Sequence, residues 1–171
     1  MEIIKTLRLT CKKGQKTILM AHYTTTGCNT EAGQVMMYSE CEVVLPRNQL
    51  QELEFDLIAL GHIHRPQEVA KGIFYSGGIN SFSFGDEGQD RGFYLHDLDT
   101  MTSEFMITPY QKYQTIRFDN EAIEAFNRGD YSPIKENITD KVVRVYFEAT
   151  QENINQFNSA ALEAVLSLIH I

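Results

Sequence analysis

The sequence predicts an α/β fold, and three of its features indicate this class. Two short apolar runs, 17–21 and 55–60, have the composition of strands that are buried inside a sheet. The stretch 46–53 begins with a proline, which suits the first turn of a short helix. From residue 113 onward, alternating runs and helical stripes follow one another as strand, helix, strand and helix. Strands that alternate with helices along a chain are typical of α/β proteins.

Turn residues separate the strands that are expected in the first 110 residues. Glycine and small polar residues interrupt the apolar runs at short intervals, as in strands that are joined by tight turns. The expected strands are 3–9, 17–21, 55–60, 68–70, 73–75, 93–98 and 103–108, and the last four form two hairpins. A turn at 12–14 would join the first two. The stretches 22–41 and 76–92 are expected to be loops, and 76–92 is too long to be a simple connection.

Residues from about 111 are expected to form a second, small domain, which divides the chain into 1–110 and 111–171. Asp119 stands where the N-cap of a helix ending near Gly129 is expected, and Thr150 stands at the head of a second helix. One apolar stripe runs along that second helix. The stripe consists of Ile154, Phe157, Ala161, Val165 and Leu168. The strands before the two helices, 113–118 and 142–148, alternate and should each turn one face inward.

Composition and charge limit the classes of function. The hydrophobic content of 43% and the charged content of 22% are those of a globular protein. A net charge of −8 argues against a protein that grips nucleic acid over its whole surface through lysine and arginine. Bound metal ions could still supply positive charge at a nucleic-acid site. No apolar run approaches the roughly 18 residues of a membrane span. Three widely spaced cysteines, Cys11, Cys28 and Cys41, favour free thiols in a reducing cytoplasm.

Three histidines follow the two buried strands. His62 and His64 come after the strand 55–60 and Gly61, and His22 comes directly after the strand 17–21. Residues two apart in an extended segment point the same way, so the first pair should face one opening. Open α/β sheets place their ligands at the carboxyl ends of strands. If the two strands are neighbours and parallel, all three imidazoles meet at one edge of the sheet.

Three neutral imidazoles suit a transition metal such as Mn, Fe or Zn. We therefore predict a metal site formed by His22, His62 and His64. Each of them could instead be an ordinary loop histidine, but the repeat of the pattern at two strand ends favours a metal. His96 lies inside a strand pattern and is interpreted as a surface or pocket-edge histidine.

At these residues the sequence resembles a known family. The segments MAHYTTTG (20–27), FDLIALGHIHRPQ (55–67) and YSGGINSFSFGDEGQDRGFYLHDL (75–98) follow in order, ahead of the strand–helix–strand–helix tail. They resemble the later half of the SbcD-type DNA repair exonuclease subunit, a calcineurin-like metallophosphoesterase. The Gly-His-x-His pattern is specific for that superfamily, and the serine- and glycine-containing segment narrows the likeness to the exonuclease branch.

The resemblance implies a fold, a chemistry and partners. Residues 1–110 would be the C-terminal half of a metallophosphoesterase β-sandwich with flanking helices, and 111–171 part of an α+β capping domain that binds DNA. His22 and His62 would bind one metal and His64 the other. The two ions, usually manganese with iron or zinc as alternatives, would flank a hydroxide that attacks a phosphodiester at a DNA end. An SbcC-type coiled-coil ATPase would be the partner of the complete protein, which would be a cytoplasmic homodimer.

The family's earlier motifs have no match here. They are an Asp-x-His, a Gly-Asp-x-x-Asp and a Gly-Asn-His-Asp/Glu, which supply the bridging aspartate, the asparagine ligand and a histidine for the leaving group. No first βαβ unit precedes the first strand, and the chain stops in the apolar LSLIHI. We therefore expect a fragment that is cut at both ends. Without a bridging carboxylate it should bind one ion weakly, and alone it should be inactive.

Two other interpretations stay open at this point. The same metal site could act on small phosphoesters or phosphoproteins, although a capping domain suits a polymer. The chain could also be a non-catalytic scaffold piece in which the histidines only pack. Truncation would also remove the other strands of the sheet and leave a long apolar edge, so we expect poor solubility or self-association of the isolated chain, which light scattering would detect.

Overall fold

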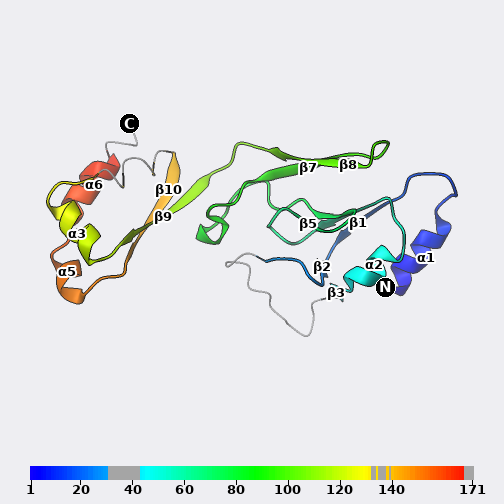
Figure 1. Cartoon of the computed structure of the whole chain (residues 1–171), viewed down its shortest axis with the longest axis horizontal. Helices are drawn as coiled ribbons and strands as arrows, with labels where there is room; N and C mark the ends of the chain where they lie inside the picture. The colour runs from blue at the N-terminus through cyan, green and yellow to red at the C-terminus, as the bar shows by residue number, and fades with distance from the viewer. Residues whose placement is uncertain (31–42, 132–133, 135–137, 139, 168–171) are drawn as a thin grey trace. The chain divides into compact units, whose positions relative to one another are not determined.

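A computed structural model describes residues 1–30, 43–131, 134, 138 and 140–167. The chain is a mixed α/β protein that divides into two compact units (Figure 1). The first unit comprises Met1–Asn80 and Gln89–Tyr110, and the second comprises Ser81–Gly88 and Gln111–Ile171. The long loop expected at 76–92 is therefore shared between the two units. No helix in the described ranges is both long and apolar enough to cross a membrane.

A four-stranded sheet forms the centre of the first unit. Its strands are β1 (Ile18–His22), β4 (Leu57–Gly61), β6 (Ile73–Tyr75) and β5 (Gln67–Ala70), in that order across the sheet. The first three are parallel, and β5 joins antiparallel as the first strand of a hairpin with β6. The two strands that histidines follow, β1 and β4, are therefore parallel neighbours, which is the condition for their histidines to meet at one edge.

A hydrogen-bonded aspartate sets the start of β1 beside the start of β4. The Asp56 carboxylate accepts from the backbone N–H of Thr17 at 2.7 Å and from its hydroxyl at 3.0 Å. The backbone N–H bond, followed by the hydroxyl bond, holds the pKa of Asp56 below its ordinary value. Asp56 is the one polar residue of its apolar run, and these contacts explain why a carboxylate stands there.

The core of the first unit lies under this sheet. Buried leucines and isoleucines from β1, β4 and β6 pack with Leu45, Leu50 and Ile63. β1 lies at one edge of the sheet in the part of the chain that the structure describes, and its other face leaves Ile18 and Met20 exposed, at 48% and 81%. An exposed apolar edge of this kind is the feature behind the predicted self-association, which stays a prediction.

The predicted strand at 3–9 is wrong, because residues Glu2–Thr10 form a helix, α1. Its β-branched residues suggest a strand, but its charges favour a helix. Glu2 lies in the first turn and Arg8 in the last, which suits the helix dipole, and Lys5 pairs with Glu2 at 3.0 Å. The Arg8 guanidinium donates to the Leu53 carbonyl at 2.8 Å and ties α1 to the residues just after α2 (Arg47–Gln51). Tertiary contacts of this kind outweigh strand propensity.

Two smaller sheets complete the first unit. β2 (Thr24–Thr25) and β3 (Val44–Leu45) form a short parallel pair. β7 (Gly92–Asp97) and β8 (Thr102–Ile107) form the second expected hairpin, which is confirmed. Most of the expected loop 22–41 lies outside the described residues.

The second unit is built on two parallel strands, β9 (Lys112–Phe118) and β10 (Lys141–Phe147). Along β10, Val143, Val145 and Phe147 turn toward the core, as the alternation predicts. The expected helix after β9 is α3 (Asn120–Asn127), and the Asp119 carboxylate caps it by accepting from the Ala122 N–H at 2.8 Å.

The predicted second helix is broken into two. Thr150 caps α5 (Gln151–Asn155) as expected, but the helix ends there and α6 (Ser159–Ser167) begins anew. The Asn158 side chain accepts from the Ala161 N–H at 3.0 Å, so Asn158 is used as a cap rather than as a helical residue. At this break the Phe157 ring packs against the rings of Phe118, Phe126 and Phe147. Leu168, the last residue of the expected stripe, lies outside the described residues.

The segment Ser81–Gly88 belongs to the second unit because its side chains bind β9. The Glu87 carboxylate accepts from the backbone N–H of Thr115 at 2.7 Å, and the Phe84 ring packs on Tyr113 with centroids 5.0 Å apart. A short 3-10 turn, η1 (Phe84–Asp86), lies within this segment. The Glu87 contact satisfies the backbone N–H of Thr115, a donor of β9. The segment therefore stabilises the second unit as well as connecting the strands.

Candidate metal centre

The carboxyl ends of β1 and β4 bring His22 and His62 together. In the parallel register, His22 lies opposite Gly61, the residue just before His62. The two imidazole rings are 5.4 Å apart between centroids and meet edge to face, with an interplanar angle of 76°. Both side chains are exposed. The predicted meeting of two histidines at this edge of the sheet is therefore present in the fold.

Gly61 provides the space for the His22 ring. A Cβ atom at Gly61 would lie 2.5 Å from His22 Nδ1 and 3.2 Å from the Cε1 carbon of the same ring. The left-handed backbone at this point belongs to His62, with φ 90°. A residue with a side chain is strained in that region, and such strain persists only where the surrounding contacts enforce it.

The structure does not bring His64 into a common group with the other two histidines. Within the ranges that the structure describes, no three residues among histidine, cysteine, aspartate and glutamate lie close enough to hold a metal ion. The reason lies in the backbone, since residues two apart share a direction only in a regular extended segment. The positive φ of His62 interrupts that regularity. Ile63 is still buried, at 2% exposure, between two exposed histidines.

The backbone of His64 is held firmly even though its ring does not join the pair. The His64 carbonyl accepts from Arg91 Nη1 at 2.6 Å and from the Gly78 N–H at 2.9 Å. Its residue type does not single out Arg91, since arginines are mostly found at the surface. The available signal is its position between a glycine-rich stretch and the apolar strand that follows.

The donor set fits part of a transition-metal site. Two adjacent imidazoles supply nitrogen ligands that Mn, Fe and Zn accept. A site for two ions needs further ligands, and carboxylates are the usual bridging groups. The set His22, His62 and His64 stays a prediction, of which the first two residues form the pair described above. Cys11 has a free thiol, and Cys41 lies outside the described residues.

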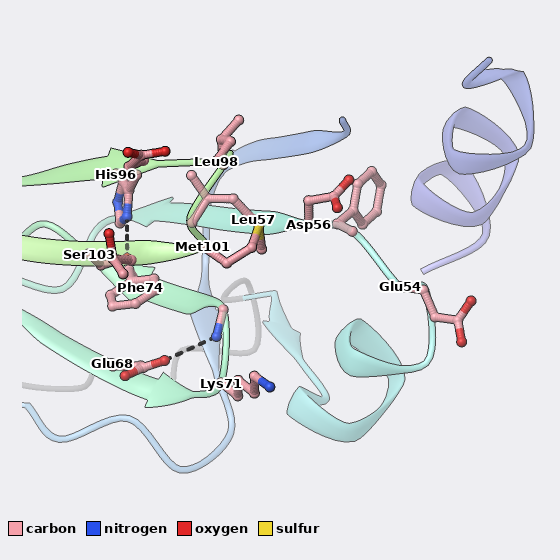
Figure 2. A pocket seen from close by; sticks show the side chains of 14 residues that line it. Glu54, Asp56, Leu57, Glu68, Lys71, Phe74, His96, Leu98, Met101 and Ser103 are labelled. Atoms are coloured by element: carbon pink, nitrogen blue, oxygen red, sulfur yellow. Dashed lines mark hydrogen bonds between the residues drawn. The ribbon is translucent and has the colours of Figure 1, made fainter. Parts of the chain in front are cut away.

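A pocket of 710 Å³ lies at the start of β4, the opposite end of that strand from His62 (Figure 2). Leu57, the first residue of β4, and Gly72, just before β6, line it together with His96 and Ser103 of the β7–β8 hairpin. The lining also includes four acidic residues, Glu54, Asp56, Glu68 and Asp97, and one lysine, Lys71. Because the histidine pair follows the carboxyl end of β4, this pocket is not part of the candidate metal centre.

His96 is the pocket-edge histidine that the sequence indicates. Its ring packs against Phe74 with centroids 4.8 Å apart, and its Nδ1 is 2.8 Å from the Ser103 hydroxyl on the neighbouring strand. Partial burial lowers the pKa of His96 below its ordinary value of 6.5, because the charged imidazolium loses hydration there. We assign it no role at the metal centre.

The pH dependence of stability should reflect the lowered pKa of His96. Between the folded and the unfolded pKa of this group, the unfolded chain binds more protons, so stability increases with pH. The contribution is complete above about pH 6.5 and is lost as the pH falls through the folded value. We expect His96→Gln to lose less stability than the wild type between pH 7 and pH 5, as measured by urea unfolding at each pH. Equal losses in both proteins would contradict this assignment.

Two comparisons with known proteins find no match to this chain. No protein-family model matches the sequence. A search of curated proteins also finds no significant match. The likeness to the exonuclease family therefore depends on the motifs in the sequence, and the function below is argued from the residues.

Proposed function

We propose that this chain is the later part of a metal-dependent DNA exonuclease subunit of the SbcD type. In this proposal the first unit is the C-terminal half of a metallophosphoesterase β-sandwich, and the second is the beginning of a DNA-capping domain. The observation that supports it most directly is the parallel register of β1 and β4, which leaves the His22 and His62 rings 5.4 Å apart. Strand ends of this kind are where α/β sheets bind their ligands.

The residues of this chain would act as ligands and supports. His22 and His62 would hold one manganese ion, and His64 would contribute to the second in the complete protein. When bound, such ions lower the pKa of a water molecule and stabilise charge on a phosphodiester. Gly61 keeps space for the His22 ring, and the β1–β4 register keeps the two rings at the same height of the sheet. The complete protein would act in the cytoplasm on DNA ends, as a homodimer with a coiled-coil ATPase.

Metal binding by the isolated chain tests the proposal. We expect the chain to bind one Mn²⁺ weakly and to show no turnover of double-stranded DNA ends, as measured by electron paramagnetic resonance and a nuclease assay. His22→Ala and His62→Ala should each weaken Mn²⁺ binding by about tenfold or more. His96→Ala removes a histidine of the same unit at the other end of the sheet and is the matched control.

Two results would count against the proposal. Equal Mn²⁺ affinity in all three histidine variants would show that the pair is not a metal site. Robust turnover by the isolated chain would show that the missing ligands are present after all. In the complete protein, a preference for small chromogenic diesters over DNA ends would favour the small-phosphoester interpretation.

Gly61→Ala offers a second test that leaves both histidines in place. The new methyl group would overlap the His22 ring, which can rotate away because it ends a side chain. We expect Mn²⁺ affinity to fall by about tenfold while the free energy of unfolding changes by less than about 1 kcal/mol. In a His22→Ala background the same substitution should have no further effect on Mn²⁺ affinity. An equal loss in that background would place the effect elsewhere.

A further inference from the structure

A fully buried arginine lies behind the loop that carries the histidines. Arg91 has no exposed surface, and its Nη1 donates to the His64 carbonyl at 2.6 Å. A guanidinium in a protein interior is stable only where its donors are hydrogen-bonded. Arg91 thus donates to the backbone of a residue in the Gly-His-x-His motif.

The backbone of Arg91 is itself fixed from the opposite side. Its carbonyl accepts from the Thr108 N–H at 2.9 Å, across the start of the β7–β8 hairpin. Gly92, the next residue, lies so close to β8 that a Cβ atom there would overlap the Met106 carbonyl. The hairpin therefore fixes the position of the Arg91 backbone, and the hydrogen bond to the His64 carbonyl fixes the position of its guanidinium.

A second segment holds the same carbonyl. The Gly78 N–H donates to the His64 oxygen at 2.9 Å. Gly77 has φ 78°, and a Cβ atom there would lie 2.7 Å from both the His64 oxygen and the Pro66 nitrogen. The glycines of the Ser-Gly-Gly segment thus allow the backbone to lie directly against residues 64–66. The donors of Gly78 and Arg91 therefore converge on one oxygen.

We propose that Arg91 is a positioning residue for the metal-binding loop. Together with Gly78 it holds the His64 carbonyl, and this contact enforces the strained left-handed backbone of His62 beside the His22 ring. A strained residue next to a ligand site needs surrounding contacts that outweigh the strain, and these are such contacts. The effect on metal binding rests on the proposed function, whereas the effect on the loop does not.

The experiment compares two variants of Arg91 with a matched control. Arg91→Met removes the donors and keeps much of the volume, and Arg91→Lys keeps a charge but lacks the planar fork. Arg47→Met is the control, since Arg47 Nη1 also donates to a backbone carbonyl of the first unit, that of Val69 at 3.2 Å. The three readouts are amide exchange at Gly78, the imidazole NMR signals of the histidines, and affinity for Co²⁺.

In Arg91→Met we expect exchange at Gly78 to accelerate by about tenfold. The ring signals of His62 and His64 should shift while that of His96 stays in place, and Co²⁺ affinity should fall by about tenfold. Arg91→Lys should shift the same two ring signals, and it carries the test if the methionine variant does not fold. Arg47→Met should change none of the three readouts.

Unchanged His62 and His64 signals in a folded Arg91 variant would overturn the proposal, whatever happens to thermal stability. The two proposals fail in different ways. A wild-type chain that binds no Co²⁺ would contradict the metal function, while the exchange and ring signals would still decide the role of Arg91.

Discussion

Replacing Gly92 by alanine is expected to lower the free energy of unfolding of the first unit by about 3 kcal/mol. The added Cβ would overlap the Met106 carbonyl and approach Ile107 Cα at 3.1 Å, and both belong to the backbone of β8. Backbone atoms cannot rotate away as a side chain can, so the two strands must separate at the start of the hairpin. The separation should also weaken the Thr108 N–H bond to the Arg91 carbonyl.

Urea unfolding and amide exchange in β7 and β8 would measure this effect. Gly14→Ala is the control, since Gly14 has φ 78° but no atom within 4 Å of its added Cβ. That control should cost only about 1 kcal/mol, from backbone strain alone. If Gly92→Ala is no more costly than Gly14→Ala, the close packing of the hairpin is not a stabilising requirement.

Phe126→Ala should destabilise the second unit by about 3–5 kcal/mol. Phe126 is 1% exposed, and its ring lies 5.5 Å from that of Phe118, 5.0 Å from Phe157 and 4.8 Å from Tyr131, between centroids. Truncation leaves a cavity among aromatic rings that are held by α3 and the turn after α5, so the core cannot collapse around it. The loss combines the hydrophobic transfer free energy with the cost of the cavity.

Amide exchange in β9 and β10 during urea unfolding would report this loss for the second unit. Tyr146→Ala is the matched control, because Tyr146 is 51% exposed on β10 and contacts Arg117 instead of the core. We expect the control to cost less than about 1 kcal/mol. Comparable losses in the two variants would show that the aromatic cluster contributes little beyond ordinary surface packing.

At the candidate site, the sequence pattern places two of the three histidines but not the third. The apolar runs before His22 and His62 predict two strands, and the β1–β4 register shows that these strands are parallel neighbours that end at one edge. The step from His62 to His64 is different, because it assumes an extended backbone that the positive φ of His62 interrupts. Local backbone conformation at a single residue depends on its tertiary contacts, which no residue pattern in the loop discloses.

By itself, the amino-acid sequence determined the mixed α/β class, the two hairpins, the helix caps at Asp119 and Thr150, and the strand ends at which histidines meet. Periodicity and capping are local, so residue order alone is enough to predict them. Only the tertiary structure decided that residues 2–10 form a helix, that Ser81–Gly88 packs with the second unit, and that Arg91 holds the His64 carbonyl. Each of these depends on contacts between residues that are far apart in the chain, and the free energy of such contacts outweighs local propensity.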